Sequence, residues 1–153
     1  MKWKQGVRLM CILSCLSLFF LEPQVAFAFS GLQVNVEVIK AERDSKVVDP
    51  ELKDLVKELA PVLNYSGFSL LKKTEIFLKA GDKGEVNLSR GRALEFGFMG
   101  FEGEQARLMV KIVEKGKETF STILLLVDKG SILIGGPPHE NGVLLLRIGG
   151  KFK

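Results

Sequence analysis

Residues 92–127 decide the fold and read RALEFGFMGF (92–101), EGE (102–104), QARLMVKIVE (105–114), KGK (115–117) and ETFSTILLLV (118–127). Three runs rich in apolar and β-branched residues are separated by short charged segments that contain glycine. The apolar residues recur at every second position over much of these runs, which is the period of a half-buried β-strand. Because turns this short join antiparallel neighbours, the stretch predicts consecutive antiparallel strands.

The same pattern extends outward in both directions. In LQVNVEV (32–38) apolar and polar residues alternate strictly. Further strand-like runs are FSLLKKTEIFLKAG (68–81), EVNL (85–88), SILIGG (131–136) and GVLLLRI (142–148). The sequence therefore predicts a mainly β (α+β) fold, an antiparallel β-sandwich or partly open barrel of about eight strands, formed by a single domain over residues 29–153.

One helix is predicted after the first strand, within VDPELKDLVKELAPVL (48–63). Asp49 is placed to cap the free amides, and Pro50 suits the first helical position. The residues at helical spacing form an apolar stripe: Leu52, Leu55, Val56, Leu59 and Leu63. Pro61 disfavours the helical conformation at Ala60, so the helix is expected to stop or kink there.

The first 28 residues predict a signal peptide. Basic residues at positions 2, 4 and 8 precede an uncharged apolar run over 9–21, and Ala26-Phe27-Ala28 provides a small-x-small cleavage site. The alternatives are a membrane anchor, for which the run is shorter than the ~20 residues required, and a lipoprotein acylated at Cys15. Cleavage after Ala28 makes the protein exported, to the periplasm or outside the cell. A bacterial envelope is favoured, and no stable membrane span is expected after cleavage.

The predicted mature chain has 125 of the 153 residues. Cleavage removes both cysteines, Cys11 and Cys15, so disulfides, thiol nucleophiles and cysteine metal clusters drop out. It also removes three basic residues and Glu22, which lowers the formal net charge from +4 to +2. A charge this small does not indicate a nucleic-acid partner.

The inventory of catalytic residues is poor. His139 is the single histidine of the chain, and no serine lies in a G-x-S-x-G elbow. The glycines at 135 and 136 are followed by prolines rather than by a helix that could hold a phosphate. Paired carboxylates stay open as an alternative, because sequence does not give their separation. We expect no enzyme activity, no metal and no cofactor.

Four residues are the candidates for binding. Tyr65 and Phe68 are close in sequence to Lys72 and Lys73, and aromatic residues beside lysines can bind sugars or single-stranded nucleic acid. The favoured interpretation is that the two aromatic side chains pack between the helix and the following strand. Pro137 and His139 belong to GGPPHENG (135–142), predicted as a loop between two strands with a tight turn at Asn141-Gly142.

A short stretch carries a resemblance. TILLLVDKGSILIGG, from Thr122 to Gly136, resembles the strand, glycine turn and strand ending Ile-Gly-Gly near the C-terminus of bacterial secretins. The match covers about a tenth of the chain and departs at Pro137, and the rest of a secretin is missing. The overall arrangement is also similar to small uncharacterised exported bacterial envelope proteins. The resemblance implies a role near a secretion or pilus assembly.

The function favoured by the sequence is a non-enzymatic exported module that binds another envelope protein, presenting a sheet edge to an incoming strand. The alternative is a small-ligand or carbohydrate-binding β-domain that uses Tyr65 and Phe68. An enzyme with a buried pair of carboxylates comes third.

Overall fold

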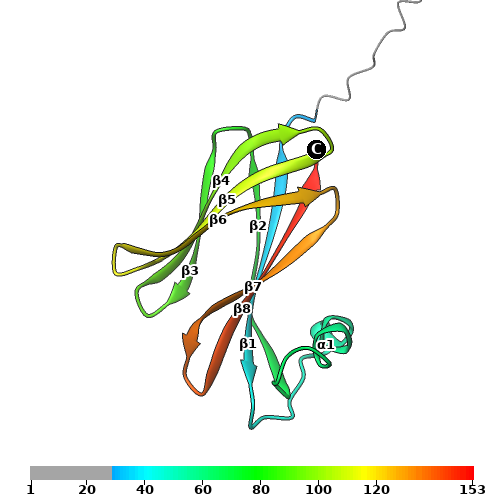
Figure 1. Cartoon of the computed structure of the whole chain (residues 1–153), viewed down its shortest axis with the longest axis vertical. Helices are drawn as coiled ribbons and strands as arrows, with labels where there is room; N and C mark the ends of the chain where they lie inside the picture. The colour runs from blue at the N-terminus through cyan, green and yellow to red at the C-terminus, as the bar shows by residue number, and fades with distance from the viewer. Residues whose placement is uncertain (1–28) are drawn as a thin grey trace, which may run out of the picture.

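The computed structural model describes residues Phe29–Lys153, which form a sandwich of two antiparallel sheets (Figure 1). The predicted fold class is confirmed, and the sandwich is the form adopted. Sheet A has the order β2-β1-β8-β7 and sheet B the order β3-β4-β5-β6. The strands are β1 (Leu32–Glu42), β2 (Gly67–Leu78), β3 (Lys83–Ser89), β4 (Arg92–Glu102), β5 (Gln105–Glu114), β6 (Lys117–Val127), β7 (Ser131–His139) and β8 (Gly142–Phe152).

Almost every pair of neighbouring strands is consecutive in the chain. The exception is the pair formed by β1 and β8, which brings the first and last strands together in the centre of sheet A. The chain passes from sheet A to sheet B after β2 and returns after β6. Four strands are therefore sheet edges: β2 and β7 in sheet A, and β3 and β6 in sheet B.

The main core lies between the two sheets. Alternate residues of the strands point inward, as the strand period requires. Most of them are almost fully buried, whereas Ile132 and Ile134 of β7 are partly buried. The buried residues include Val34 and Val36 of β1, Phe96 and Phe98 of β4, and Leu108 of β5. Buried area of this kind is the dominant favourable contribution to folding.

A second cluster covers the outer face of the lower part of sheet A, the part that extends below sheet B in Figure 1. β1 keeps one alternation throughout, so Val38 faces the inner core whereas Ile39 and Ala41 face the outer cluster. The register shift between β1 and β2 at this point leaves Leu71 of β2 unpaired. The other buried members of the cluster are Leu52 from the helical segment, Phe68 of β2 and Leu145 of β8, and Leu52 and Phe68 are each 1% exposed.

One short helix follows the first strand, as predicted. It begins as a 3-10 turn, η1 (Pro50–Leu52), continues as α1 (Lys53–Leu59) and ends before Pro61, as expected. The predicted cap was wrong, because the Asp49 side chain makes no bond to the first helical turn. Its carboxylate accepts a hydrogen bond from the backbone N–H of Leu70 at 3.3 Å, which fastens the start of the helix to β2.

Tight turns join the hairpins where glycine and charged residues predicted them. At Arg90-Gly91 and Lys115-Gly116 both residues have positive φ, the conformation that matches the twist of paired strands. The expectation for GGPPHENG was wrong in its extent, because β7 continues to His139 and the turn is Glu140-Asn141. Proline is tolerated there because β7 is an edge strand with an irregularity between Gly135 and Pro138.

Both ends of the described chain lie at one end of the sandwich. The Ser30 hydroxyl donates to the Lys153 carbonyl at 3.0 Å. The ring of Phe29 packs 5.3 Å from Phe101 and 5.1 Å from Phe152, measured between centroids. The predicted signal peptide lies outside the described residues. Within Phe29–Lys153 no helix has the length and apolar character needed to cross a membrane.

Candidate functional site: the free edge and outer face of sheet B

The four sheet edges differ in how they are protected from additional strands. Edge strands expose unpaired backbone N–H and C=O groups, and proteins commonly block them with charges, proline, bulges or short length. β2 carries the exposed Lys72 and Lys73 in its middle. β7 carries Pro137 and Pro138 together with its irregular pairing. Both edges of sheet A therefore have features that oppose strand addition.

In sheet B only one of the two edges is protected. β3 has seven residues and presents Lys83 and Glu85 to solvent. β6 has eleven residues, and after Lys117 and Glu118 its remaining sequence, TFSTILLLV, contains no charge, glycine or proline. β6 is thus the long, apolar edge that is open to another strand.

From Ile123 onward the outward-facing side chains of β6 are also apolar. Ile123 and Leu125 are each 47% exposed, and Val127 is 52% exposed. On the neighbouring strands the half-buried Met109 lies opposite Ile123, Arg107 lies opposite Leu125, and Met99 of β4 is 52% exposed. Contiguous exposed apolar residues are characteristic of interaction sites on soluble proteins. We call the five apolar residues the sheet B apolar face.

A shallow hollow of about 390 Å³ adjoins this face. Gly97 lies opposite Met109 in the pairing of β4 with β5, and the absence of a side chain there leaves space beside the methionine. The charged residues that line the hollow are Lys83, Glu85, Glu95 and Lys111. The apolar face is therefore bordered on one side by charges of both signs, as is common for the rim of a protein interface.

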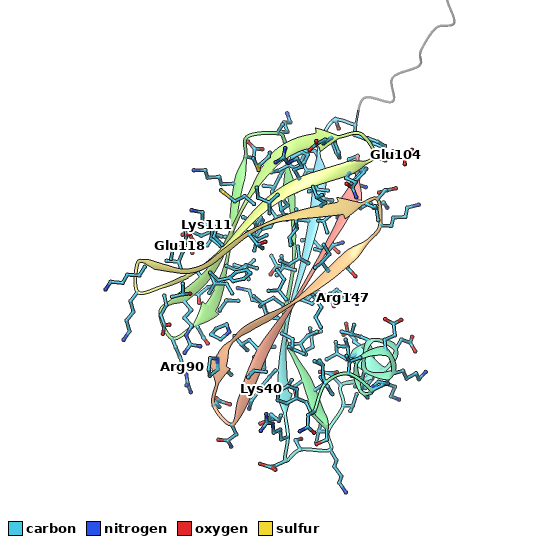
Figure 2. All side chains as sticks on the ribbon, in the orientation of Figure 1. Lys40, Arg90, Glu104, Lys111, Glu118 and Arg147 are labelled. Carbon is cyan, nitrogen blue, oxygen red and sulfur yellow. The ribbon has the colours of Figure 1, made fainter. Side chains whose placement is uncertain are left out.

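Lys111 and Glu118 form an ion pair at the boundary of the apolar face, and Figure 2 shows them close together on β5 and β6. The hydrogen bond from the Lys111 ammonium to the Glu118 carboxylate, with the Coulomb attraction between them, raises the pKa of Lys111 above its ordinary value. Lys111 therefore stays ionised at neutral pH, and the ion pair marks the polar end of β6.

Phe120 faces the other side of the same strand. It pairs with Ile112, which belongs to the inner core, yet Phe120 is 39% exposed. Figure 1 shows why: the β5–β6 hairpin projects beyond the region that sheet A covers. A strand added to β6 would meet apolar side chains on both of its faces.

The residues singled out from sequence do not gather at this edge. Phe68 is 1% exposed in the outer cluster, so its ring has almost no surface to offer a ligand. Tyr65 packs at the border of that cluster, with the Arg43 guanidinium 5.6 Å from its ring centroid. Pro137 and His139 are on β7, in the other sheet from β6. The sequence feature that indicates the β6 edge is the charge-free run TFSTILLLV (119–127).

His139 lies at the lower mouth of the space between the sheets. It lines a pocket of about 450 Å³ with residues of β1, β2 and β3, among them Val38, Lys72 and Asn87. Its side chain is 11% exposed, and its Nδ1 is buried without a hydrogen-bond partner in the described structure. Nearby, Arg92 Nη1 donates to the Pro138 carbonyl at 2.7 Å and ties β7 to sheet B.

An ion-pair cluster holds the tip of the β7–β8 hairpin against β1. Lys40 Nζ lies 2.6 Å from Glu140 Oε2 and 2.9 Å from Glu42 Oε1. The hydrogen bond from Lys40 lowers the pKa of Glu140, and the bonds to Glu140 and Glu42 raise the pKa of Lys40. Figure 2 shows Lys40 and Arg90 near this hairpin. Both pKa shifts arise from the attraction between Lys40 and the two carboxylates. The cluster is therefore explained by its role in holding the hairpin, without a catalytic role.

Replacing His139 with alanine is expected to lower the free energy of unfolding by only about 1 kcal/mol, since the lost packing is offset by removal of an unpaired buried nitrogen. Binding at β6 should be unchanged. Urea unfolding of the wild type and the variant would measure the difference. A loss of several kcal/mol, or loss of partner binding, would show that the histidine has a role beyond packing.

Comparison of the chain with protein-family models, with curated proteins and with solved structures gave no match. The resemblance of Thr122–Gly136 to secretins and the similarity to small exported envelope proteins therefore stay predictions. In the fold this segment joins β6 to β7, which belong to different sheets and do not pair with each other. Across Phe29–Lys153 no group of three or more His, Cys, Asp or Glu is arranged to hold a metal ion.

Proposed function

We propose that the chain is an exported, non-enzymatic module of the bacterial envelope that binds another protein by accepting one of its segments as an additional strand beside β6. The observation that carries the proposal is the contrast between edges: β6 alone among the four has a run of nine residues without a charge, proline or glycine, and its one register shift lies at Thr119, where that run begins. In strand addition, main-chain hydrogen bonds supply affinity and side-chain contacts supply specificity.

The chemistry of the edge defines the incoming segment. Side chains of a strand alternate between two faces. On one face the segment would pack beside Ile123, Leu125 and Val127, and on the other beside Phe120. We therefore infer an extended segment of about eight residues with apolar side chains on both faces and no proline in its middle. The resemblance to secretins makes a component of a secretion or pilus assembly a suitable source of such a segment.

A photocrosslinking experiment tests the site directly. The full-length chain would carry a photoreactive amino acid at Leu125 and be expressed in its source cells, with a second version carrying it at Leu71 of β2. Leu71 is a matched control because it is also 47% exposed on a sheet edge. Mass spectrometry should identify one envelope protein crosslinked from Leu125 and not from Leu71. Capture of the same proteins from both positions, or of none, would contradict the proposal.

Introducing a charge at the same position gives a second test. Leu125→Lys is expected to weaken binding of the captured protein by at least about tenfold, since a lysine on an edge opposes strand addition. Because the side chain is half exposed, the free energy of unfolding should change by less than about 1 kcal/mol. Leu71→Lys should leave binding unchanged. Affinities measured by isothermal titration and stabilities measured by urea unfolding separate the two effects.

A further inference from the structure

The outer face of sheet A above the helical cluster carries a polar hollow that the proposed function does not use. Two cross-strand rows define it. One row runs Glu75, Asn35, Gly149 and Ser131 across β2, β1, β8 and β7, and the next runs Lys73, Glu37, Arg147 and Leu133. Figure 2 shows Arg147 near the middle of sheet A. The hollow has a volume of about 320 Å³.

Gly149 opens the hollow at its centre. A β-carbon at this position would meet atoms of Gly130, Ser131 and Asn35 at 3.5–3.9 Å, which is ordinary contact distance. A side chain would therefore fit there, and its absence leaves a depression between Asn35 and Ser131. By contrast, Gly150 faces inward, where a β-carbon would lie 3.1 Å from Leu32, so packing explains that glycine.

The charges around the hollow are only partly neutralised. Its lining has four basic residues, Lys73, Lys129, Arg147 and Lys151, and two acidic residues, Glu37 and Glu75. The Glu37 carboxylate is 3.3 Å from Arg147 and 3.4 Å from Lys73. Within Phe29–Lys153, Lys129 and Lys151 form no ion pair. The residues that line the hollow therefore carry an excess of two positive charges, and one of them, Lys73, also pairs with Glu51 outside the lining at 3.6 Å. Lys129 and Lys151 are available to an anion.

The lining also has groups that suit hydroxyls. Arg147 Nε donates to the Ser131 hydroxyl at 3.2 Å, which fixes the guanidinium across the floor. Glu75 accepts from Gln33 at 2.9 Å and, like Glu37, keeps further acceptor capacity because each carboxylate can accept about four hydrogen bonds. A simple anion such as phosphate or sulfate would satisfy the lysines but would face these carboxylates unfavourably.

We propose that this hollow binds a saccharide that contains uronic acids. The ring carboxylates would pair with Lys129 and Lys151, since charge-assisted bonds are the stronger ones. The ring hydroxyls would donate to Glu37 and Glu75 and exchange bonds with the Ser131 hydroxyl, which is both a donor and an acceptor. The site is independent of the protein-binding edge, because its residues come from sheet A and the adjoining β6–β7 turn.

The test uses trigalacturonate and trimannuronate as probes and neutral galactotriose as the control ligand, with the protein made from the full-length chain. Isothermal titration should detect binding of at least one uronate trimer and weaker binding of galactotriose by about tenfold or more. Absence of binding by both uronate trimers would overturn the proposal. Equal affinity for the neutral trimer would overturn it as well, because the lysines would then have no role.

Variants locate the site. Gly149→Val should fill the hollow and reduce affinity for the bound trimer by at least about tenfold, whereas Gly135→Val is the matched control, because nothing lies within 4 Å of a β-carbon there. If Gly149→Val does not fold, the exposed pair Lys129→Ala/Lys151→Ala gives the same test, with Lys46→Ala/Lys117→Ala as the charge-matched control. Equal losses in variant and control would show non-specific attraction and overturn the proposal.

Discussion

Replacing Phe98 with alanine is expected to lower the free energy of unfolding by about 3–5 kcal/mol. Phe98 is 2% exposed between the sheets, and its ring packs edge to face against Phe101 at a centroid distance of 5.0 Å. The variant loses the buried ring and leaves a cavity that the rigid sheets fill only in part. Urea denaturation monitored by circular dichroism measures the change.

The control for Phe98→Ala is Phe77→Ala, because Phe77 is the same residue type but 49% exposed on β2. Its replacement should cost about 1 kcal/mol or less. Equal effects of the two substitutions would contradict the packing of sheet A on sheet B at this end of the sandwich.

The second large effect is expected at Gly142, the first residue of β8. A β-carbon there would clash with the carbonyl oxygen of Ala41 and lie 3.0 Å from the carbonyl carbon. Because the obstacle is backbone, Gly142→Ala must push β8 away from β1 where Gly142 pairs with Glu42. We expect a loss of about 3 kcal/mol, at the upper end of the usual cost of overpacking.

Gly135→Ala is the comparison for Gly142→Ala, because a β-carbon at Gly135 meets nothing within 4 Å. It should change stability by less than about 1 kcal/mol, and thermal unfolding of both variants would separate them. Equal stability of the Gly142→Ala and Gly135→Ala variants would contradict the close contact between the backbones of β1 and β8 at Gly142.

Most of the fold could be predicted from local sequence. Alternation in LQVNVEV and the glycine-containing turns between residues 92 and 127 depend on neighbouring residues, and the structure confirms the strands and the turns. Local signals failed where tertiary contacts decide. Pro137 and Pro138 indicated a loop, but an edge strand accommodates them. Asp49 had the sequence of a cap, but the Leu70 amide takes its carboxylate.

The candidate sites were less predictable, because they depend on strand order. The sequence predicted that a sheet edge is presented, yet four strands are edges, and only the pairing shows that β6 is one of them. The polar hollow joins Asn35, Glu75, Ser131 and Gly149, which are far apart in the chain. No local period links such residues. Phe68 was a binding candidate because it is an aromatic residue close to two lysines in the sequence. In the structure it is buried, because the helix packs over it.

The pairing of β1 with β8 has a consequence for the order of events during synthesis. Ser30 and Lys153, which are hydrogen-bonded, are 123 positions apart. The centre of sheet A therefore cannot form until the last strand has left the ribosome, and contacts of such long range also form slowly. Until then β1 has a partner on one side only. If the chain is exported, as we propose, this delay would preserve an extended state that can pass through a membrane channel, and the complete sandwich would form on the far side.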